Sequence, residues 1–557
     1  MELLSFSKVP FSKLIFLIPL FSFATFLEIF SLSLLVPVIQ LLLGQDFESN
    51  ILNSFSNYFI NSETFIFISI ILIFIFSALV RLFALKCQIS IVFHIVSKLR
   101  TNILNSFQKI SYHSYISMDH ENFISSISVK IGMIAHGVLL PIVSLFSNGL
   151  TIFSAIVFVY YLMGINGLFF ICVLALIFYA TYTFSKSKLI SNSNIINSNT
   201  NSRINVLLSL VNFQRELRIF NLSDNLIKKY GFIENELKEA ETQNQYLSLF
   251  PKITIETVIY IIIIAFTYAY NTANNIELSV VLPNILVTAI AIQKILPLIQ
   301  QVYFAFSSIS SSYYVVNDVV NLIQNIHNQI PNKPKITHNS SNLTILSDFE
   351  IIVKNASIIY KSPPAQINLP YIKISSGSFY LLKGESGAGK SSLLDLLAGL
   401  MPLHSGSITI NDSYVNLDEL DIWQSNISYA SQNPVLISGT IRSNIILDSD
   451  FNQAKFNQSI EISGLTSLLN KFTEREFRAV GPNSTSFSGG EKQRIALARA
   501  LYKDSSIILL DEPTSGLNKE LESEFLQKLK YLKGSKTVII SSHTIKLSEI
   551  FDDVITL

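Results

Sequence analysis

The chain has little charge and almost no cysteine. Only 14% of its 557 residues are Asp, Glu, Lys or Arg, whereas soluble domains carry about 25%. The formal net charge is +1, so the composition gives no reason to expect a nucleic-acid partner. Cys87 and Cys172 are the only cysteines, and both lie in apolar runs. This argues against a disulfide framework and against a cysteine metal site.

Long apolar runs fill the first 325 residues or so. A membrane-spanning helix needs about 20 apolar residues, and runs such as 64–80 do not fit buried helices of a soluble protein. The first run is too long and too uncapped for a cleaved signal peptide. The sequence therefore predicts an all-α, six-helix transmembrane domain over 1–325. Its spans lie near 13–43, 64–97, 136–163, 166–184, 248–270 and 278–303.

Lys and Arg are absent from three of the predicted loops, at 44–63, 164–167 and 271–283. Because cytoplasmic loops carry the excess of these residues, both termini and the long connections between the other spans are predicted to be cytoplasmic. Two amphipathic pieces of those connections, 112–127 and 211–221, are candidate contact elements for a cytoplasmic domain. Ordinary solvated loops are the alternative.

Several ionisable residues lie within or beside the predicted spans. Such residues are costly in lipid and usually face a cavity or a partner. Arg81, Lys86 and Lys294 can line a path for an anionic substrate. The alternative is structural pairing, for example of Glu256 with Lys294, or snorkelling to the inner interface. The full set is Glu28, Arg81, Lys86, His94, Glu256 and Lys294.

Residues 326–347 lose the apolar pattern and contain two prolines, so they are predicted to form a linker to a second domain over 348–557. That domain is organised around the loop Gly384-Glu385-Ser386-Gly387-Ala388-Gly389-Lys390-Ser391, which follows an apolar strand and opens a helix. Its backbone N–H groups can wrap a phosphate chain, Lys390 can reach the outer phosphates, and Ser391 can hold Mg²⁺. The positive end of the helix dipole points at the same anion. A chance glycine turn is the alternative, but the strand–turn–helix context favours bound ATP and Mg²⁺.

Polar side chains also follow three later strands. Gln432 comes after one strand, Asp511 and Glu512 end a buried strand, and His543 follows the strand 537–540. Asp511 can hold Mg²⁺, and Glu512 can activate the attacking water as a general base. His543 can donate to the γ-phosphate, and Gln432 can contact Mg²⁺ and water. Each has an ordinary structural explanation alone, but their fixed order argues against coincidence.

The stretch Phe487-Ser488-Gly489-Gly490-Glu491 resembles Leu-Ser-Gly-Gly-Gln, the signature of ABC transporters. Over its full length the chain resembles the exporter type, with six spans followed by one α/β P-loop nucleotide-binding domain. Tyr360 resembles the aromatic residue that stacks on adenine, and 515–518 resembles the loop that crosses the dimer interface. The resemblance implies a homodimer whose domains meet head to tail, with each ATP held between one phosphate loop and the other copy's signature. ATP closure and hydrolysis would switch the membrane halves between inward and outward access.

The predicted site thus has three sets of residues. The catalytic residues are Glu512, His543 and Gln432, and the metal ligands are Ser391, Gln432 and Asp511. The nucleotide-binding residues are Tyr360, Gly384, Glu385, Ser386, Gly387, Ala388, Gly389, Lys390, Ser391, Ser392, Ser488, Gly489, Gly490 and Glu491.

A narrower resemblance concerns the substrate. Residues 26–37, 107–124 and 215–220 resemble parts of lipid-linked-oligosaccharide flippases of the PglK type. That branch moves polyprenyl-pyrophosphate glycans across the bacterial cytoplasmic (inner) membrane. It implies a multi-pass protein of that membrane whose lipid-like, amphipathic substrate carries a pyrophosphate head group. The alternatives are a generic lipid, drug or peptide exporter, and a regulatory protein that closes on ATP but transports nothing.

The chain departs from the family pattern in four places. Pro482 lies where the segment before the signature usually carries Glu and Gly, and Asn518 replaces an Asp. Glu491 replaces the signature Gln, and the chain stops soon after His543, without the usual final strands and C-terminal helix. We therefore expect altered communication between the two sites and altered dimer contacts, but no loss of phosphate, Mg²⁺ or water handling.

Overall fold

A computed structural model gives the fold. It describes Phe6 and residues 15–34, 63–163, 165–274, 297–330, 348–361, 364–385, 387–415, 421–481, 487–514, 519–543 and 550–557. The chain forms two compact units. Unit 1 contains Met1–Gln108 and Asp119–Asn328, and unit 2 contains Lys109–Met118 and Gln329–Leu557. Most of the predicted linker, 331–347, lies outside the described residues, so the boundaries at 325 and 348 stay predictions.

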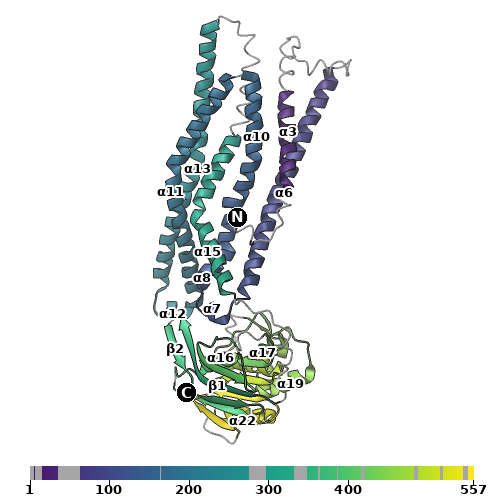
Figure 1. The fold of residues 1–557 in the computed structure, drawn as a ribbon, viewed down its shortest axis with the longest axis vertical. Coiled ribbons are helices and arrows are strands. Elements are labelled where there is room, and N and C mark those ends of the chain that lie inside the picture. Colours follow the sequence, from purple (N-terminus) through teal and green to yellow (C-terminus); the bar gives the residue numbers. More distant parts are fainter. Residues whose placement is uncertain are drawn as a thin grey trace. The chain divides into compact units, whose positions relative to one another are not determined.

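Unit 1 is built from helices wherever the structure describes it (Figure 1). Two of its segments, η1 and η2, are short π-helical turns. The elements are α3 (Leu17–Ser33), α6 (Glu63–Phe107), α8 (His120–Ser125), η1 (Ser126–Lys130), α9 (Ile131–Ile134), η2 (Ala135–Leu139), α10 (Leu140–Met163), α11 (Ile165–Asn212), α12 (Gln214–Ile219), α13 (Ser223–Asn274), helical residues 297–311, and α15 (Tyr313–Gln329).

Two stretches of the described helices are long and apolar enough to cross a membrane, Ile68–Phe107 and His120–Ser154, and Leu17–Glu28 is a shorter apolar helix. Helices occupy five of the six predicted spans, whereas 278–296 of the sixth lies outside the described residues. The α-helical fold is therefore confirmed, and the number of spans stays a prediction.

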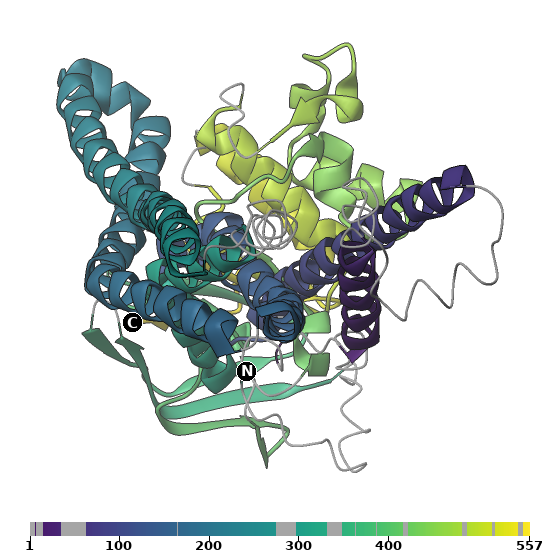
Figure 2. The same cartoon turned by 90° about the horizontal axis from the view of Figure 1, so that it is seen from above.

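The helices of unit 1 pack through apolar side chains along their lengths. α11 and α13 run beside each other in Figure 1 and in the view from above (Figure 2). Ile196 and Val206 of α11 join Ile233 and Leu237 of α13 in one buried cluster. Burial of these side chains, at about 25 cal/mol per Å² of apolar surface, stabilises the pair.

A buried ion pair joins η1 to α15. The side chain of Lys130 is fully buried and pairs with Asp318. The Lys130 ammonium also donates to Asn122 Oδ1 at 3.0 Å. Because a buried charge is costly unless it is paired and hydrogen-bonded, these two partners make the position of Lys130 tolerable. The residues lie far apart in sequence, and no sequence motif joins them.

Unit 2 combines α7 with an antiparallel sheet, a parallel sheet and a group of helices. The antiparallel sheet has the order β2-β1-β5-β6, with β3 paired to β1. The strands are β1 (Glu350–Lys361), β2 (Pro364–Asn368), β3 (Ile372–Ser375), β5 (Ser405–Ile410) and β6 (Ser413–Tyr414). The helices and short turns of the unit are α7 (Tyr112–Ile116), α16 (Lys390–Leu397), α17 (Asp421–Ser425), α18 (Ile441–Ile446), α19 (Gln453–Ile462), α20 (Thr466–Leu469), η5 (Arg475–Phe477), α21 (Gly489–Tyr502), α22 (Lys519–Leu529) and η6 (Lys530–Leu532).

The parallel sheet has the order β12-β4-β11-β10-β7. Its strands are β4 (Phe379–Lys383), β7 (Ile427–Ala430), β10 (Ile507–Asp511), β11 (Thr537–Ser541) and β12 (Asp553–Thr556), and a small ribbon pairs β8 (Gly439–Thr440) with β9 (Ala479–Val480). Strands β10 and β11 are buried along their whole length. Such strands are covered on both faces and read as continuous apolar runs.

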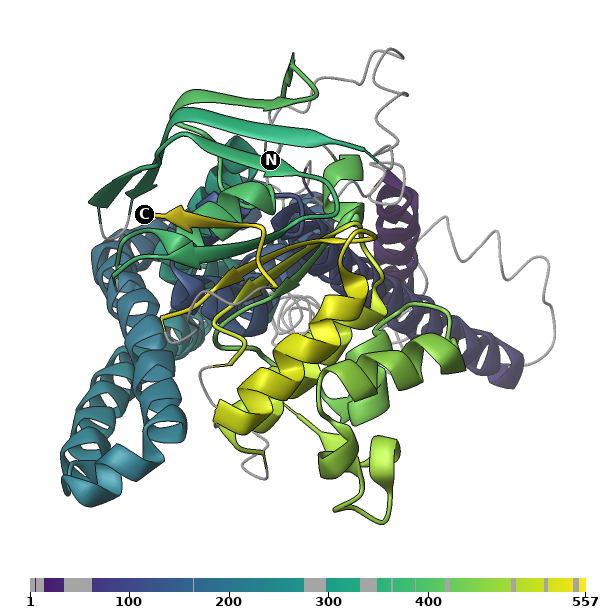
Figure 3. The same cartoon turned by 90° about the horizontal axis from the view of Figure 1, so that it is seen from below.

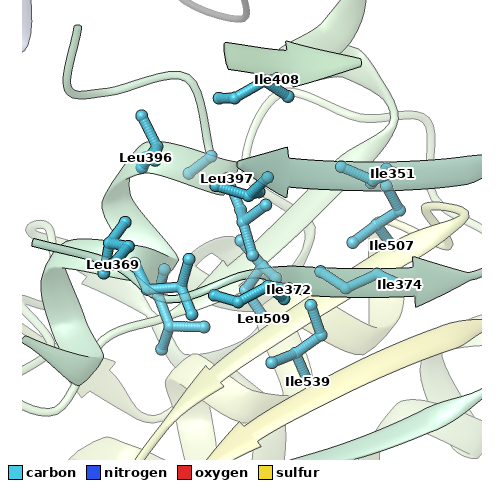
Figure 4. Packing of buried hydrophobic residues seen from close by; sticks show 14 of the residues in the cluster. Ile351, Leu369, Ile372, Ile374, Leu396, Leu397, Ile408, Ile507, Leu509 and Ile539 are labelled. Atoms are coloured by element: carbon cyan, nitrogen blue, oxygen red, sulfur yellow. The ribbon is translucent and has the colours of Figure 1, made fainter. Parts of the chain in front are cut away.

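Alternate residues of the parallel strands face two different layers. Leu509 and Ile539 pack against α16 and the antiparallel sheet, and Figure 4 shows both in the same cluster as Leu397 of α16. Leu510 and Ile540 pack against α21 and α22 on the opposite face. Figure 3 shows the long green strands of the antiparallel sheet on one side of the yellow strands and a yellow helix on the other. This sandwich places the ends of the parallel strands beside the start of α16.

α7 packs within unit 2. His113 Nε2 lies 3.1 Å from the carbonyl oxygen of Ile359 in β1, and Ile116 packs against the core that contains α16. The predicted amphipathic piece 112–127 is therefore divided, because Asp119 caps a new helix. Its carboxylate accepts the backbone N–H groups of residues 121 and 122 at 3.1 and 3.0 Å. The second predicted piece contains α12 of unit 1, and its contact role stays a prediction.

Candidate functional site: a nucleotide site at the edge of the parallel sheet

The predicted phosphate loop connects β4 to α16. Gly389, the N-cap of α16, has a φ of +97°, a left-handed conformation that favours glycine. A Cβ atom there would lie 2.5 Å from Cγ2 of Ile367. Gly387 has a φ of +85° and open space around it. The loop therefore requires glycine at these two motif positions. Ser386 lies outside the described residues.

Lys390 is 6% exposed, and its ammonium points back across the loop. It donates to the carbonyl oxygens of Gly384 at 2.9 Å and Glu385 at 3.0 Å. Its third contact is His543 Nε2, at 2.8 Å. These three contacts match the three hydrogens of an ammonium group. Phosphate oxygens entering the loop would compete for the same donors.

The two carboxylates at the end of β10 share one neighbour, Ser541. The Ser541 hydroxyl lies 2.6 Å from Asp511 Oδ1, and the Glu512 backbone N–H donates to Ser541 Oγ at 2.9 Å. Glu512 has a φ of +48°, an uncommon conformation for a residue with a side chain and one that recurs at functional sites. Asp511 is 5% exposed. The structure thus fixes both carboxylates from the next strand.

Gln432 and His543 both contact Glu512. Gln432 Nε2 donates to Glu512 Oε2 at 2.9 Å, and His543 Nε2 lies 3.0 Å from Glu512 Oε1. The same His543 nitrogen contacts Lys390, so it can accept from the ammonium in one tautomer or donate to Glu512 in the other. The proposed base therefore lies in one contact network with the phosphate-loop lysine.

The proposed metal ligands offer only oxygen. Asp511 brings a carboxylate, Ser391 a hydroxyl, and Gln432 an amide oxygen, because its Nε2 is directed at Glu512. Hard oxygen donors of this kind suit Mg²⁺, so the residues present fit the ion. Their roles as ligands remain predictions.

A group of polar side chains surrounds the middle of α16. The Tyr429 hydroxyl donates to Asp395 Oδ1 at 3.2 Å. The pKa of the Asp395 carboxyl is raised to about 6, chiefly by burial; the Tyr429 hydrogen bond lowers this pKa, and the Asp511 charge raises it. Burial, followed by the charge of Asp395, also raises the pKa of Tyr112 in α7. Asp395, a residue of the phosphate helix, therefore acts electrostatically on α7.

The predicted adenine-stacking residue, Tyr360, is part of β1 and contacts the first turn of α16. Its hydroxyl donates to Ser392 Oγ at 2.9 Å, and Ser392 is buried whereas Ser391 is exposed. The ring is thus anchored one residue beyond the proposed magnesium ligand. Stacking on adenine stays a prediction.

The signature residues form the N-terminus of α21. Ser488 is the N-cap, with Glu491 N donating to Ser488 Oγ at 3.3 Å and Ser488 N donating to Glu491 Oε2 at 2.9 Å. This reciprocal capping box explains how Glu491 can replace the usual Gln. Gly489 is exposed, and a Cβ there would meet nothing within 4 Å. This helix end is open, and Gly490 follows in the same turn.

The structure brings Lys390, Gln432, Asp511, Glu512 and His543 together at the carboxyl ends of parallel strands, where ligands bind in open α/β sheets. Ser488 and Glu491 bond instead to each other. Some positions with sequence predictions lie outside the described residues, namely Ser386, Lys294, Pro482 and the loop 515–518 with Asn518.

Comparisons with known proteins agree with this architecture. A family model described as "ABC transporter" matches residues 368–515. The structure of a bacterial Atm1-family ABC exporter with ATP bound resembles the chain with a TM-score of 0.76 and 17% identity, over 98% of this chain and 93% of that one. The chain has the fold of an exporter-type ABC half-transporter. The predicted fold class, an all-α membrane domain followed by an α/β P-loop domain, is confirmed.

Curated relatives match one part of the chain. A putative export ATP-binding/permease protein of Rickettsia bellii is 32% identical over 228 residues, which cover 41% of this chain and 40% of the relative. An ATP-dependent lipid A-core flippase of Colwellia psychrerythraea is 35% identical over 212 residues, covering 36% of this chain and 35% of the relative. The matched segment thus spans about two fifths of the length of these relatives.

Sequence reasoning missed three polar residues of the site. Ser541 could have been noticed as a hydroxyl directly after the apolar residues Val538, Ile539 and Ile540. Gln493 of α21 donates to the backbone oxygen of Gln432 at 3.1 Å, and no local pattern announces that contact. Asp395 gave no signal because it occupies an ordinary position of an amphipathic helix.

Proposed function

We propose that the chain works as a homodimeric, ATP-driven membrane transporter that exports or flips an amphipathic substrate. The observation that carries the proposal is the contact network of Lys390, His543, Glu512 and Gln432 at the edge of the parallel sheet. Long apolar helices in the same chain support a membrane location. Leu72, Leu79 and Leu82 of α6, for example, are each more than half exposed. Exposed apolar surface of this kind suits lipid.

ATP hydrolysis would use the described side chains as follows. The N–H groups at the start of α16 and the Lys390 ammonium hold the phosphates. Glu512 accepts a proton from the attacking water, and His543 and Gln432 orient that carboxylate through their contacts with its two oxygens. Mg²⁺ held by Ser391, Gln432 and Asp511 would neutralise charge on the phosphate oxygens.

The homodimer follows from the number of motifs in one chain. The chain has one phosphate loop and one signature, and the start of α21 is open at Gly489. A helix N-terminus of this kind binds anions through its unpaired N–H groups and its dipole. Two copies arranged head to tail would place each signature on the other copy's γ-phosphate.

We propose that α7 links nucleotide binding to the membrane helices, since the chain on either side of it belongs to unit 1. His113 contacts β1 directly before Tyr360, and the pKa of Tyr112 responds to Asp395. A movement of Tyr360 or α16 on nucleotide binding would therefore change the contacts of α7.

For the substrate we propose a lipid with an anionic head group, first of all a polyprenyl-pyrophosphate glycan, in the bacterial cytoplasmic membrane. Arg81 Nη1 pairs with Glu28 Oε1 at 2.7 Å, yet the Arg81 side chain is 53% exposed. An exposed guanidinium can bind phosphate with two donors at once. A relative named as a lipid A-core flippase supports a lipid substrate. A regulatory, non-transporting role rested on Pro482 and Asn518, and no described residue favours it.

The site is tested by the ATPase rate of the purified chain in lipid nanodiscs. Lys390→Ala should abolish hydrolysis because it removes the main phosphate cation. Glu512→Gln should bind ATP normally but fail to turn over, because only water activation is lost. Near-parental hydrolysis in either variant would refute the assignment of that residue. The matched controls are Lys373→Ala and Glu524→Gln, which change half-exposed residues of surface ion pairs.

The substrate is tested by adding a polyprenyl-pyrophosphate glycan to the same nanodiscs. Stimulation of ATP hydrolysis that disappears in Arg81→Ala would support the flippase. A basal rate that does not respond to the glycan would keep the transporter and withdraw this substrate. ATP binding without any hydrolysis would contradict the homodimeric transporter.

A further inference from the structure

Ser541 has an unusual position for a hydroxyl group. It is the last residue of β11, its side chain is fully buried, and it pairs in register with Asp511 of β10. Residues 537, 539 and 541 share one face of the sheet, and that face packs against α16. Ser541 therefore lies on the side of the sheet from which the phosphate helix begins.

Chemistry fixes the direction of both Ser541 hydrogen bonds. An ionised carboxylate can only accept, so the hydroxyl hydrogen goes to Asp511 Oδ1, 2.6 Å away. A backbone N–H can only donate, so Glu512 N–H is directed at Ser541 Oγ, at 2.9 Å, and shares its hydrogen with the Ser541 backbone oxygen at 3.2 Å. One hydroxyl thus orients the side chain of one carboxylate residue and the backbone of the next.

The backbone contact matters because Glu512 is held at a φ of +48°. Left-handed backbone is unfavourable for a residue with a side chain, so it persists only where neighbouring groups hold it. The Ser541 contact supports the turn that directs the Glu512 side chain toward Gln432 and His543.

A second buried serine of the same sheet shows what a hydroxyl without this role looks like. Ser428 lies on β7, on the other side of β10 from β11, and is 2% exposed. Within the part of the chain that the structure describes, its Oγ has no hydrogen-bond partner. Ser541 and Ser428 therefore differ in their bonds and not in their burial.

We propose that Ser541 is a positioning residue for the two carboxylates of the ATP site, holding Asp511 for the metal ion and Glu512 for water activation. This inference rests on the proposed ATPase function and deepens it. Outer-shell groups that hold a metal ligand typically contribute 10- to 100-fold to metal affinity or activity.

The test is Mn²⁺ binding by the full chain in nanodiscs, measured by electron paramagnetic resonance with a non-hydrolysable ATP analogue. Ser541→Ala should weaken Mn²⁺ binding about tenfold or more, while affinity for the analogue in EDTA changes less than twofold. Ser428→Ala, the matched control, should bind Mn²⁺ like the parental chain. Ser541→Thr keeps a hydroxyl and should recover most of the Mn²⁺ affinity, whereas the similarly shaped Ser541→Val should not.

Parental Mn²⁺ affinity in a folded Ser541→Ala variant would overturn the inference. Should Ser541→Ala fail to fold, Ser541→Thr and Ser541→Val provide the comparison of a side chain with and without a hydroxyl. Equal Mn²⁺ affinity in these two variants would then overturn the inference. Failure of the proposed function looks different, because the parental chain itself would then bind no Mn²⁺ with the nucleotide.

Discussion

Replacing Asp395 by asparagine is expected to stabilise unit 2 at neutral pH and to remove part of its pH dependence. The folded chain raises the pKa of this carboxyl from 3.8 to about 6, chiefly through burial. Between these two values the folded state keeps a proton that the unfolded chain has lost. The free energy of unfolding therefore falls as the pH rises through this window, and the loss is complete above the folded pKa.

The size of the effect follows from the two pKa values. One unit corresponds to 1.36 kcal/mol, so the shift amounts to an upper bound of about 3 kcal/mol. Asparagine is neutral at every pH, and its amide oxygen can still accept from Tyr429. The Asp395→Asn chain should match the parental chain only below the unfolded pKa of 3.8, and exceed its stability by up to about 3 kcal/mol at pH 8.

The chain offers a built-in reporter for this measurement. Trp423 is its only tryptophan, is buried in unit 2, and donates from Nε1 to the carbonyl oxygen of Leu397, the last residue of α16, at 2.7 Å. Tryptophan fluorescence during urea unfolding of the full chain, without nucleotide and with EDTA, therefore reports on the layer that contains Asp395. Asp448→Asn, at an exposed aspartate of the same unit, is the control.

The quantity to compare at each pH is the difference between the unfolding free energies of the variant and the parental chain. Other groups titrate in the same pH range, but their contributions are the same in both chains and cancel in this difference. A difference that grows between pH 4.5 and 7 supports the buried, protonated carboxyl. The same difference at pH 5 and pH 8 would refute the reasoning.

Two further predictions concern strain and buried charge. Gly389→Ala should weaken binding of a fluorescent ATP analogue at least tenfold, because left-handed backbone costs about 1–2 kcal/mol and the new Cβ would meet Ile367. Adding Ile367→Ala should recover the part of the affinity that is lost through the clash. Parental affinity in the Gly389→Ala variant would contradict the loop geometry. Asp318→Asn leaves the Lys130 ammonium buried without its carboxylate, at a cost of about 3–5 kcal/mol, seen as a lower midpoint of thermal unfolding by circular dichroism. The double variant Lys130→Met, Asp318→Leu should regain most of the loss, and a double variant as unstable as the single one would contradict the pairing.

The sequence predicted those parts of the site that short motifs encode. Lys390 and Gly389 belong to one loop, and the spacing of its glycines and lysine predicts the loop's geometry. Asp511 and Glu512 follow a continuous apolar run, which predicts a buried strand. Ser541 escaped prediction because its role depends on which strand lies beside β10. Strand order is set by the packing of whole layers, and local propensity contains no information about it.

The membrane unit illustrates the same limit. Apolar length predicted the helices, because each span needs about 20 apolar residues. The partner of a charged residue in a helix depends on how the helices rotate and pack, so the pairing of Arg81 with Glu28 was not foreseen. The Lys130–Asp318 pair joins residues far apart in the chain and likewise had no local signal.

The inclusion of α7 in unit 2 has a consequence for how the protein is made. The backbone oxygen that His113 contacts belongs to a residue 246 positions later in the chain. At about 5–20 residues per second, a ribosome needs roughly 10–50 s to reach it. During that interval α7 has no docking partner, and Ile116 has no core to enter. Final folding of the N-terminal half must therefore wait for the C-terminal half, and a chaperone that covers residues 109–118 would find its substrate in that interval.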